Sequence, residues 1–406
     1  MTDSRAAIEA VFREEHGLVV AGLARYLGDL ELAEDALQDA CVAALGDWTD
    51  GIPRNPAAWL TTTARRKAVD RIRRTRNLQR KYEVIAREID NLSDEMMDDD
   101  VIADDRLRLI FTCCHPSLGI EVRLALTLKT VGGLTTAEIA NAFLVPEPTM
   151  AQRIVRAKRK IRDAGIPYRV PPDTELPERL PAVLAVIYLI YNEGYASTAG
   201  DTVRRPDLAV EAIRLATIVD SLLPHEPEVL GLLALMEFNE ARADARTDAV
   251  GNVVLLADQD RSLWDLERIR AAHQTLERAL DRESPGPYQI QAAIAAVHAD
   301  AARAEDTDWG QIAALYSSLR RYNDSPVVVL NHGVAVAMAT DPQTGLTMID
   351  GIEGLEAYPY FHAARASLLN DLGDEDAALT AYRAAADVAT SDSQRRFFAM
   401  RIAEFG

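Results

Sequence analysis

The sequence predicts an all-α fold, and three observations carry this prediction. Hydrophobic residues make up 48% of the 406 residues and aromatic residues only 6%, a composition rich in alanine and leucine that favours helices over sheets. Apolar residues recur at steps of three and four along most of the chain. From about residue 173 onward, this pattern is organised in helix pairs of about 30–40 residues, which is typical of a helical solenoid.

Charge and cysteine content narrow the class of protein. Residues 1–170 carry 25 basic and 26 acidic residues, whereas residues 171–406 carry 19 basic residues, none of them lysine, and 37 acidic ones. No window is apolar enough for a membrane span, the first residues do not read as a signal peptide, and the three cysteines lack a CxxC pair. We expect a cytoplasmic protein without disulfides that uses its first half for any contact with nucleic acid.

Two helices are expected first, over residues 8–27 and 31–45. The second has a predicted buried face made of Leu37, Cys41, Ala44 and Leu45. Its opposite side gathers polar residues, three of them acidic: Glu34, Asp35, Gln38 and Asp39. From this helix alone, the acidic side can be either a solvated face or a docking surface.

A loop between residues 46 and 56, which contains Trp48 and several Gly and Pro residues, should precede a strongly basic helix. This helix begins near Trp59, and its inward residues are Leu60, Ala64, Ala68 and Ile72. Residues 65–81 include nine basic residues and a single acid, Asp70, which predicts contacts with phosphates. The basic positions of the helix are Arg65, Arg66, Lys67, Arg71, Arg73 and Arg74.

Residues 133–161 predict two short helices joined by a tight turn. Thr135 or Thr136 can cap the first, which buries Ile139, Ala140 and Phe143. Pro146 and Pro148 suit the first turn of the second helix, whose inward stripe is Met150, Ile154, Ala157 and Ile161. Its outer face carries Thr149, Gln152, Arg153, Arg156, Arg159 and Lys160. Six basic residues and no acid lie between positions 153 and 162, so the pair predicts a helix-turn-helix that reads DNA in the major groove.

Together these segments resemble a bacterial extracytoplasmic-function (ECF) sigma factor. The resemblance rests on an acidic AEDxxQD helix, a Trp-bearing loop, a WLxxxARxxxxDxxRR helix, a linker and a terminal helix-turn-helix. It implies sigma region 2 at residues 1–80, an acidic linker at 81–105, sigma region 4 at 106–168 and a tetratricopeptide-like repeat domain at 173–406. The chain departs from the usual pattern at Arg66, Leu144 and Pro146, which bears on promoter sequence more than on class.

The resemblance also implies roles for individual residues. Glu34, Asp35, Gln38 and Asp39 would bind the clamp helices of core RNA polymerase. Trp48, Trp59 and the basic positions of the following helix would melt and hold the minus-ten element. Thr149, Gln152, Arg153, Arg156, Arg159 and Lys160 would bind the minus-thirty-five element.

Two intervening segments allow more than one interpretation. Residues 83–105 hold ten acids and one base, and they can be a disordered spacer or a strand that occupies the nucleic-acid channel of polymerase, as in similar sigma factors. Cys113, Cys114 and His115 invite a metal site, but a structural zinc usually needs four ligands, so buried thiols are expected instead. We expect no metal and no cofactor.

The repeat domain shows its clearest pattern near the end of the chain, at Ala366, Gly373, Ala378, Tyr382 and Ala385. Its most distinctive string is YLIYNEGY at residues 188–195, which resembles the sigma-factor subgroup with a long tetratricopeptide-like extension. In that string, Tyr191, Asn192, Glu193 and Tyr195 can line a regulatory pocket, or the tyrosines can pack where Gly194 ends a helix.

The sequence therefore predicts an alternative sigma factor, not an enzyme, whose partners are core RNA polymerase and promoter DNA. We expect the acidic repeat domain to contact the chain's own sigma regions and regulate them. One rival is a ligand-responsive helix-turn-helix regulator, which has no need of the N-terminal helices. An enzyme using Glu193 with a histidine is disfavoured, because the candidate histidines are scattered: His225, His273, His298, His332 and His362.

Overall fold

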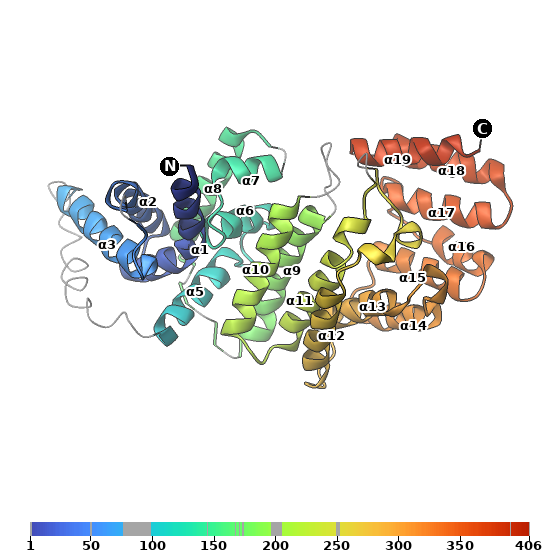
Figure 1. Ribbon diagram of the computed structural model, residues 1–406, viewed down its shortest axis with the longest axis horizontal. Coiled ribbons are helices and arrows are strands. Elements are labelled where there is room, and N and C mark those ends of the chain that lie inside the picture. The colour runs from blue at the N-terminus through green and yellow to red at the C-terminus, as the bar shows by residue number, and fades with distance from the viewer. Residues whose placement is uncertain are drawn as a thin grey trace. The chain divides into compact units, whose positions relative to one another are not determined.

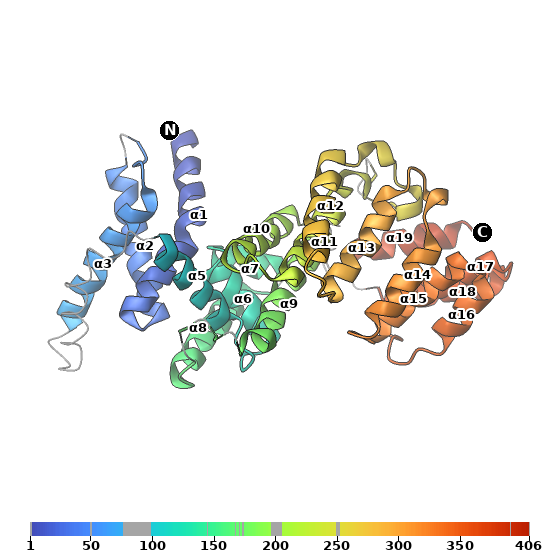
Figure 2. The same cartoon turned by 90° about the horizontal axis from the view of Figure 1, so that it is seen from below.

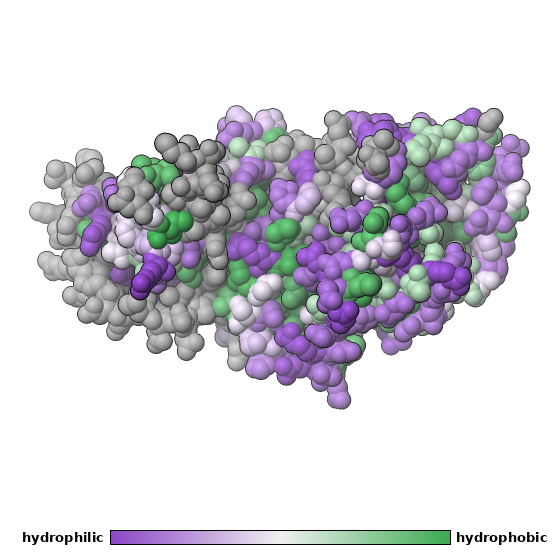
Figure 3. All heavy atoms as spheres, in the orientation of Figure 1, coloured by the Kyte–Doolittle hydropathy of each residue, from purple (hydrophilic) through white to green (hydrophobic). Residues whose placement is uncertain are grey.

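The computed structural model describes residues 2–48, 51–75, 99–143, 145–166, 168–169, 171–172, 174–195, 205–248, 252–389 and 391–405. These residues are mostly helical, and the β pairing among them is a single isolated bridge between Thr247 and Val253. The all-α prediction is confirmed. No described helix is long and apolar enough to cross a membrane. On the face shown in Figure 3, hydrophilic residues predominate and apolar ones are interspersed among them.

The chain divides into two compact units, residues 1–189 and 190–406. The division falls inside helix α9 (Leu176–Tyr195), downstream of the proline-rich segment at residues 166–172. Most of α9 therefore belongs with the first unit, where the Arg179 guanidinium donates a hydrogen bond to the Phe111 carbonyl at 3.0 Å.

The first unit begins with three helices that pack on one another: α1 (Thr2–Leu27), α2 (Leu30–Asp47) and α3 (Pro56–Thr75). They confirm the expected N-terminal helices and the loop between the second and third. The expected buried face of α2 was partly wrong, because Cys41 is half-buried and Leu45 is 48% exposed. The buried stripe instead runs through small residues, at Ala33, Ala36, Leu37, Ala40 and Ala44. Because alanine side chains are small, the neighbouring helices can pack closely on this side of α2. The acidic side of α2 therefore faces away from the packed helices α1 and α3.

Four further helices complete the sigma part of the first unit: α5 (Asp99–Cys113), α6 (Ile120–Thr130), α7 (Thr136–Ala142) and α8 (Glu147–Asp163). α5 packs against α1 and α6, and α8 packs against α6 and α7. The core at this end is built from Leu109, Ile110, Phe111, Leu126 and Leu128, each at most 2% exposed.

The second unit is a run of helices: α10 (Pro206–Leu222), α11 (Pro227–Glu240), α12 (Leu266–Leu280), α13 (Pro287–Asp300), α14 (Trp309–Leu319), α15 (Pro326–Ala339), α16 (Pro342–Asp350), α17 (Pro359–Asp371), α18 (Glu375–Asp387) and α19 (Asp392–Ala403). Six of these begin with proline, whose fixed φ suits a first helical turn and which lacks the amide that would be unpaired there. The helices of this run pack on their neighbours in the chain, as Figures 1 and 2 show for α13 to α18, and α11 also packs closely on α13.

The repeat predicted near the C-terminus is confirmed as the helix pair α17–α18. Gly373 lies between the helices with φ of +81°, a conformation that residues with a Cβ rarely adopt. The small and aromatic positions of the pattern, Ala366, Ala378, Tyr382 and Ala385, are all buried at the contact between neighbouring helices. Small residues at fixed spacing thus set how closely each pair stacks.

We predict that the second unit is destabilised as pH falls from about 6.5 to 4, and that His298 contributes to this loss. Burial, with Arg242 and Arg261 nearby, lowers the pKa of His298 from 6.5 to about 4. The unfolded chain then binds more protons than the folded one across that interval, so stability rises with pH there. His298→Gln should remove about 1–3 kcal/mol of the pH dependence, measured by urea unfolding at pH 7 and pH 4.5. An unchanged pH profile would show that His298 titrates alike in both states.

Candidate polymerase and promoter interfaces

The helix-turn-helix is formed by α7 and α8. Thr135 caps α7 reciprocally with Glu138: its hydroxyl accepts from the Glu138 amide at 3.1 Å, and its own amide donates to the Glu138 carboxylate at 2.7 Å. Pro148 lies in the first turn of α8, as expected from the sequence, whereas Pro146 is the residue before the helix. The inward stripe of α8 is confirmed, because Met150, Ile154, Ala157 and Ile161 are all buried.

The outer face of α8 presents five of its six predicted DNA-binding side chains to solvent. Thr149, Gln152, Arg156, Arg159 and Lys160 are exposed, although the Lys160 ammonium also donates to the Ser117 carbonyl at 2.5 Å. Arg153 is less free, because its side chain is 26% exposed and forms an ion pair with Glu121 at 3.1 Å. Leu144, where the family usually has glycine, lies outside the described residues.

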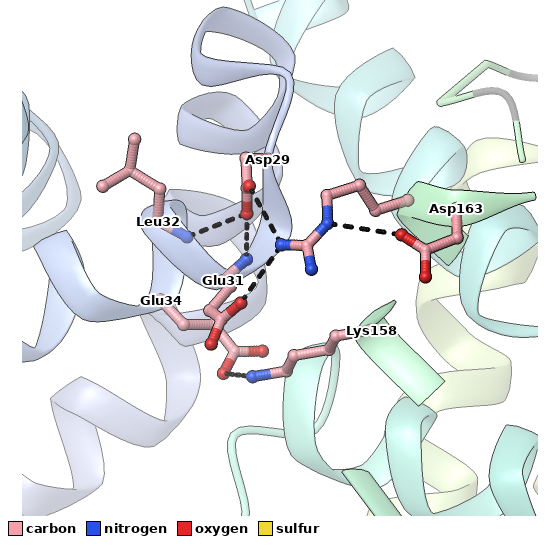
Figure 4. A network of polar contacts seen from close by, with 7 residues as sticks. Asp29, Glu31, Leu32, Glu34, Lys158 and Asp163 are labelled. Carbon is pink, nitrogen blue, oxygen red and sulfur yellow. Dashed lines mark hydrogen bonds and ion pairs between the residues drawn. The ribbon is translucent and has the colours of Figure 1, made fainter. Parts of the chain in front are cut away.

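On another side of α8, the long side chains of Lys158 and Arg162 reach the first turns of α2 and the residue before it, and form a polar network there (Figure 4). Lys158 donates to the Glu34 carboxylate at 2.5 Å, and the two side chains are only 13% and 11% exposed. The second Glu34 oxygen accepts from the Thr130 hydroxyl at 3.0 Å. Arg162 adds weaker contacts to Glu31 at 3.5 Å and to Asp29 at 3.8 Å. A charge pair so nearly removed from water is costly to break on one side only.

Contacts elsewhere extend this junction between the first three helices and the helix-turn-helix. The Tyr168 hydroxyl donates to the carbonyls of Ala21 at 2.8 Å and of Asp105 at 3.2 Å. A Cβ added to Gly17 in α1 would lie 2.6 Å from the carbonyl oxygen of Val131, the residue that follows α6. The backbone of α1 therefore comes very close to the backbone at the end of α6. We call this set of contacts, centred on Glu34 and Lys158, the α2–α8 junction.

The four predicted polymerase-binding residues are therefore not equivalent. Gln38 and Asp39 are exposed, Asp35 is half-buried, and Glu34 is engaged by Lys158 and Thr130. Sequence reasoning placed Glu34 on an acidic face but did not find its partner, because Lys158 lies 124 positions away. Their pairing depends on how two helices pack.

The predicted minus-ten residues also differ in exposure. Trp48 is 5% exposed and packs against Phe12 and Trp59, at ring distances of 5.5 and 5.2 Å, so in this conformation it is a core residue and not a surface contact. Arg65 stacks over the Tyr26 ring at 4.4 Å. The side chains that this conformation exposes are Arg66 and Lys67. The side chains of Arg71, Arg73 and Arg74, and residues 81–98 of the predicted acidic linker, lie outside the described part of the chain. The prediction of a linker was wrong for residues 99–105, which belong to helix α5.

The cysteines near the end of α5 are buried thiols, as expected. Cys113 and Cys114 are at most 2% exposed, and the Cys114 sulfur lies 3.4 Å from the Thr127 hydroxyl. Burial raises the pKa of Cys113 well above its usual value and that of Cys114 to about 11. Among the residues described, no three His, Cys, Asp or Glu side chains are grouped as a metal site would require. These thiols are therefore protonated packing groups.

In the string at residues 188–195, Tyr191 is fully buried and its hydroxyl lies 3.2 Å from the Met236 carbonyl and 3.3 Å from Glu240. Its ring stacks on Tyr195 at 5.6 Å. Gly194 is a helical residue of α9, and a Cβ there would lie 2.4 Å from the Ala209 amide nitrogen of α10. Tyr191 and Gly194 therefore serve packing, while the pocket role of Asn192, Glu193 and Tyr195 stays a prediction.

Comparison with protein families gives three matches along the chain. Residues 11–78 match sigma-70 region 2, and residues 108–161 match sigma-70 region 4. Residues 179–280, from α9 to the end of α12, match a family of unknown function, DUF6596. No solved structure matches the chain.

Comparison with individual proteins gives relatives of two kinds. The chain is 43% identical to the uncharacterized protein R00370 of Rhizobium meliloti (strain 1021), over 94% of this chain and 92% of the relative. It is 31% identical to the ECF RNA polymerase sigma factor SigK of Mycobacterium ulcerans (strain Agy99), over 38% of this chain and 83% of that protein. The SigK protein of Mycobacterium bovis (strain BCG / Pasteur 1173P2) is 30% identical over 36% of this chain and 78% of its own length.

The match to region 2 is what separates this chain from a simple helix-turn-helix regulator, and region 4 coincides with the α7–α8 geometry described above. Proteins of this family act in transcription initiation and are not enzymes. With both sigma regions present and SigK relatives covered over most of their length, the chain belongs to the ECF RNA polymerase sigma factors and carries a helical C-terminal extension.

Proposed function

We propose that this sigma factor binds core RNA polymerase through the acidic side of α2 and directs it to promoters recognised by α3 and α8. The observation that carries the proposal is the separation of charge within one unit: the Asp39 carboxylate is exposed on α2 beside the neutral Gln38, while basic side chains are exposed on α3 and α8. An acidic face suits a basic protein surface, and the basic faces suit phosphates.

The α2–α8 junction bears on when this activity is available. Glu34 belongs to the proposed polymerase-binding face, yet Lys158 of the recognition helix occupies it at 2.5 Å. Polymerase that engages Glu34 must therefore replace Lys158 as its partner. We infer that binding of polymerase to α2 competes with the α2–α8 junction and releases α8 toward the upstream promoter element.

Run-off transcription tests the proposed function. Full-length protein added to core RNA polymerase should produce a transcript from its promoter, and Asp39→Lys should abolish most of it by placing a like charge against the polymerase surface. Glu178→Lys, an exposed acid of α9 outside the α2–α8 junction and the proposed interfaces, is the matched charge control. If the protein binds a promoter tightly without polymerase and never supports a transcript, the rival of a simple helix-turn-helix regulator holds instead.

We predict that Gln152→Ala and Arg156→Ala each cost about 1–3 kcal/mol in promoter binding by the holoenzyme and relax specificity at one upstream position. Both side chains are exposed on the outer face of α8. Arg153→Ala is a less clean test, because it also removes an ion pair with Glu121. Binding of mutated promoter fragments measures the effect, and an equal loss on every sequence would assign these side chains to phosphate contacts.

We further propose that the second unit regulates the sigma regions. What supports this is charge, because residues 171–406 carry 37 acids against 19 basic residues, while α3 and α8 expose basic side chains. A chain that ends after Leu189 keeps the whole first unit, including the contact of Arg179 with Phe111. Its transcription should differ from that of the full-length chain, and equal rates under all conditions would rule the regulation out.

A further inference from the structure

An acidic side chain from another helix lies beside the basic outer face of α8. Between positions 153 and 162 the sequence has six basic residues and no acid. Glu121, in the first turn of α6, nevertheless forms an ion pair with Arg153 at 3.1 Å. Because the Glu121 side chain is 70% exposed, it adds a negative charge at the solvent-facing edge of this surface. Packing of α6 on α8 thus supplies an acid that the sequence of α8 lacks there.

The segment that leads into α6 also holds a second basic side chain of the same face. The Ser117 carbonyl accepts a hydrogen bond from the Lys160 ammonium at 2.5 Å. A neutral carbonyl fixes the position of Lys160 and leaves its charge unchanged, whereas the Glu121 carboxylate offsets the charge of Arg153. Arg153 therefore differs in net charge from the other basic positions of the face, although its side chain is of the same type as Arg156.

This difference in charge bears on what each side chain can bind. Phosphate contacts depend mainly on positive charge, and a carboxylate 3.1 Å from a guanidinium repels any phosphate that approaches it. Hydrogen bonds to neutral acceptors of a base edge, such as O6 and N7 of guanine, do not require a net charge. Glu121 contacts the Nη2 atom of Arg153, and a guanidinium carries several N–H groups, so donors remain for a base edge.

We propose that Glu121 is a specificity-determining residue of region 4, which directs Arg153 to a base edge of the upstream promoter element and away from phosphates. Glu121 acts through Arg153, so it is a positioning residue. The inference rests on the proposed function, in which α8 binds promoter DNA as part of the holoenzyme. Removal of the carboxylate should let Arg153 bind the nearest phosphate, which tightens binding to every sequence and weakens the preference at one base pair.

The test measures which sequences the holoenzyme selects. Full-length protein with core RNA polymerase binds duplex DNA fragments of random sequence, and repeated selection and sequencing give the base preference at each position. At one upstream position the parent should prefer a base by about fivefold or more, and Arg153→Gln should remove this preference. Glu121→Gln should reduce the same preference to below about twofold. It should also raise affinity for the unselected pool and steepen the slope of log affinity against log salt by about 0.9.

Two further variants show whether Glu121 acts through Arg153. In the Arg153→Gln background, Glu121→Gln should have no further effect on any base preference or on the salt slope. Glu178→Gln removes an exposed acid of α9 outside the proposed interfaces, so it is the matched control and should select the same sequences as the parent.

The inference is overturned if Glu121→Gln matches Glu178→Gln in both selection and salt slope. It is also overturned if Glu121→Gln acts equally with and without Arg153, if it weakens binding to all sequences, or if Arg153→Gln changes no base preference. A parent holoenzyme that selects no sequence would contradict the proposed function itself, and the inference with it. That failure is recognised in the parent, whereas failure of the inference alone is recognised in the variants.

Discussion

Replacing Lys158 by methionine should tighten the binding of core RNA polymerase by about tenfold or more. Methionine keeps the apolar stem but leaves the Glu34 carboxylate, 11% exposed, with Thr130 as its remaining partner in the α2–α8 junction. Removing one partner of a buried ion pair destabilises a protein by about 3–5 kcal/mol. Because Lys158 and Glu34 are slightly exposed, we expect a cost near the lower end of that range. This cost destabilises only the conformation in which the α2–α8 junction is formed. The fraction of molecules whose α2 is available to polymerase therefore rises, and the apparent affinity for polymerase rises with it.

Fluorescence anisotropy of the labelled chain with core polymerase measures this affinity, and hydrogen exchange of α2 measures opening directly. Arg159→Met is the matched control, because it removes one positive charge from the exposed side of the same helix. In a double-mutant cycle, Glu34→Gln should reduce the effect of Lys158→Met on exchange, since both act on one contact. If Lys158→Met and Arg159→Met bind polymerase alike and α2 exchanges as in the parent chain, the junction does not limit polymerase binding.

The second large effect is expected at Gly194, where alanine should destabilise the second unit by about 3 kcal/mol. The added Cβ would lie 2.4 Å from the Ala209 nitrogen and 2.9 Å from its Cα, and a backbone cannot rotate away as a side chain does. α9 and α10 must then separate, with loss of packing around Tyr191. For a unit of this size, the melting temperature should fall by about 6–12 °C.

Gly310→Ala in α14 provides the comparison, because its Cβ would meet only one side-chain oxygen at 3.4 Å. Alanine in an unobstructed helical position stabilises by about 0.5–1 kcal/mol, so this variant should melt slightly higher than the parent chain. Circular dichroism follows both transitions. A Gly194→Ala protein that melts with the parent would show that α9 and α10 do not approach as closely as described.

The sequence by itself determined the helical class, the helix-turn-helix and the family. These features depend on local patterns: apolar residues at steps of three and four, prolines in first turns, and the cap at Thr135, each of which acts within a few residues. The inward stripe of α8 was predicted correctly for the same reason, because the spacing of apolar residues along a single helix determines which face is buried. The buried face of α2 was harder, since its core positions are alanines, whose small side chains give a weak apolar signal.

Only the tertiary structure decided which side chains are available and which meet. Trp48 reads as a loop aromatic that can contact DNA, yet Phe12 and Trp59 enclose it. Glu34 belongs to an acidic surface in the sequence, and a lysine 124 positions away nearly removes it from water. Contacts of this kind depend on how whole helices pack, because the partners are brought together by buried surfaces elsewhere in each helix and not by their own spacing.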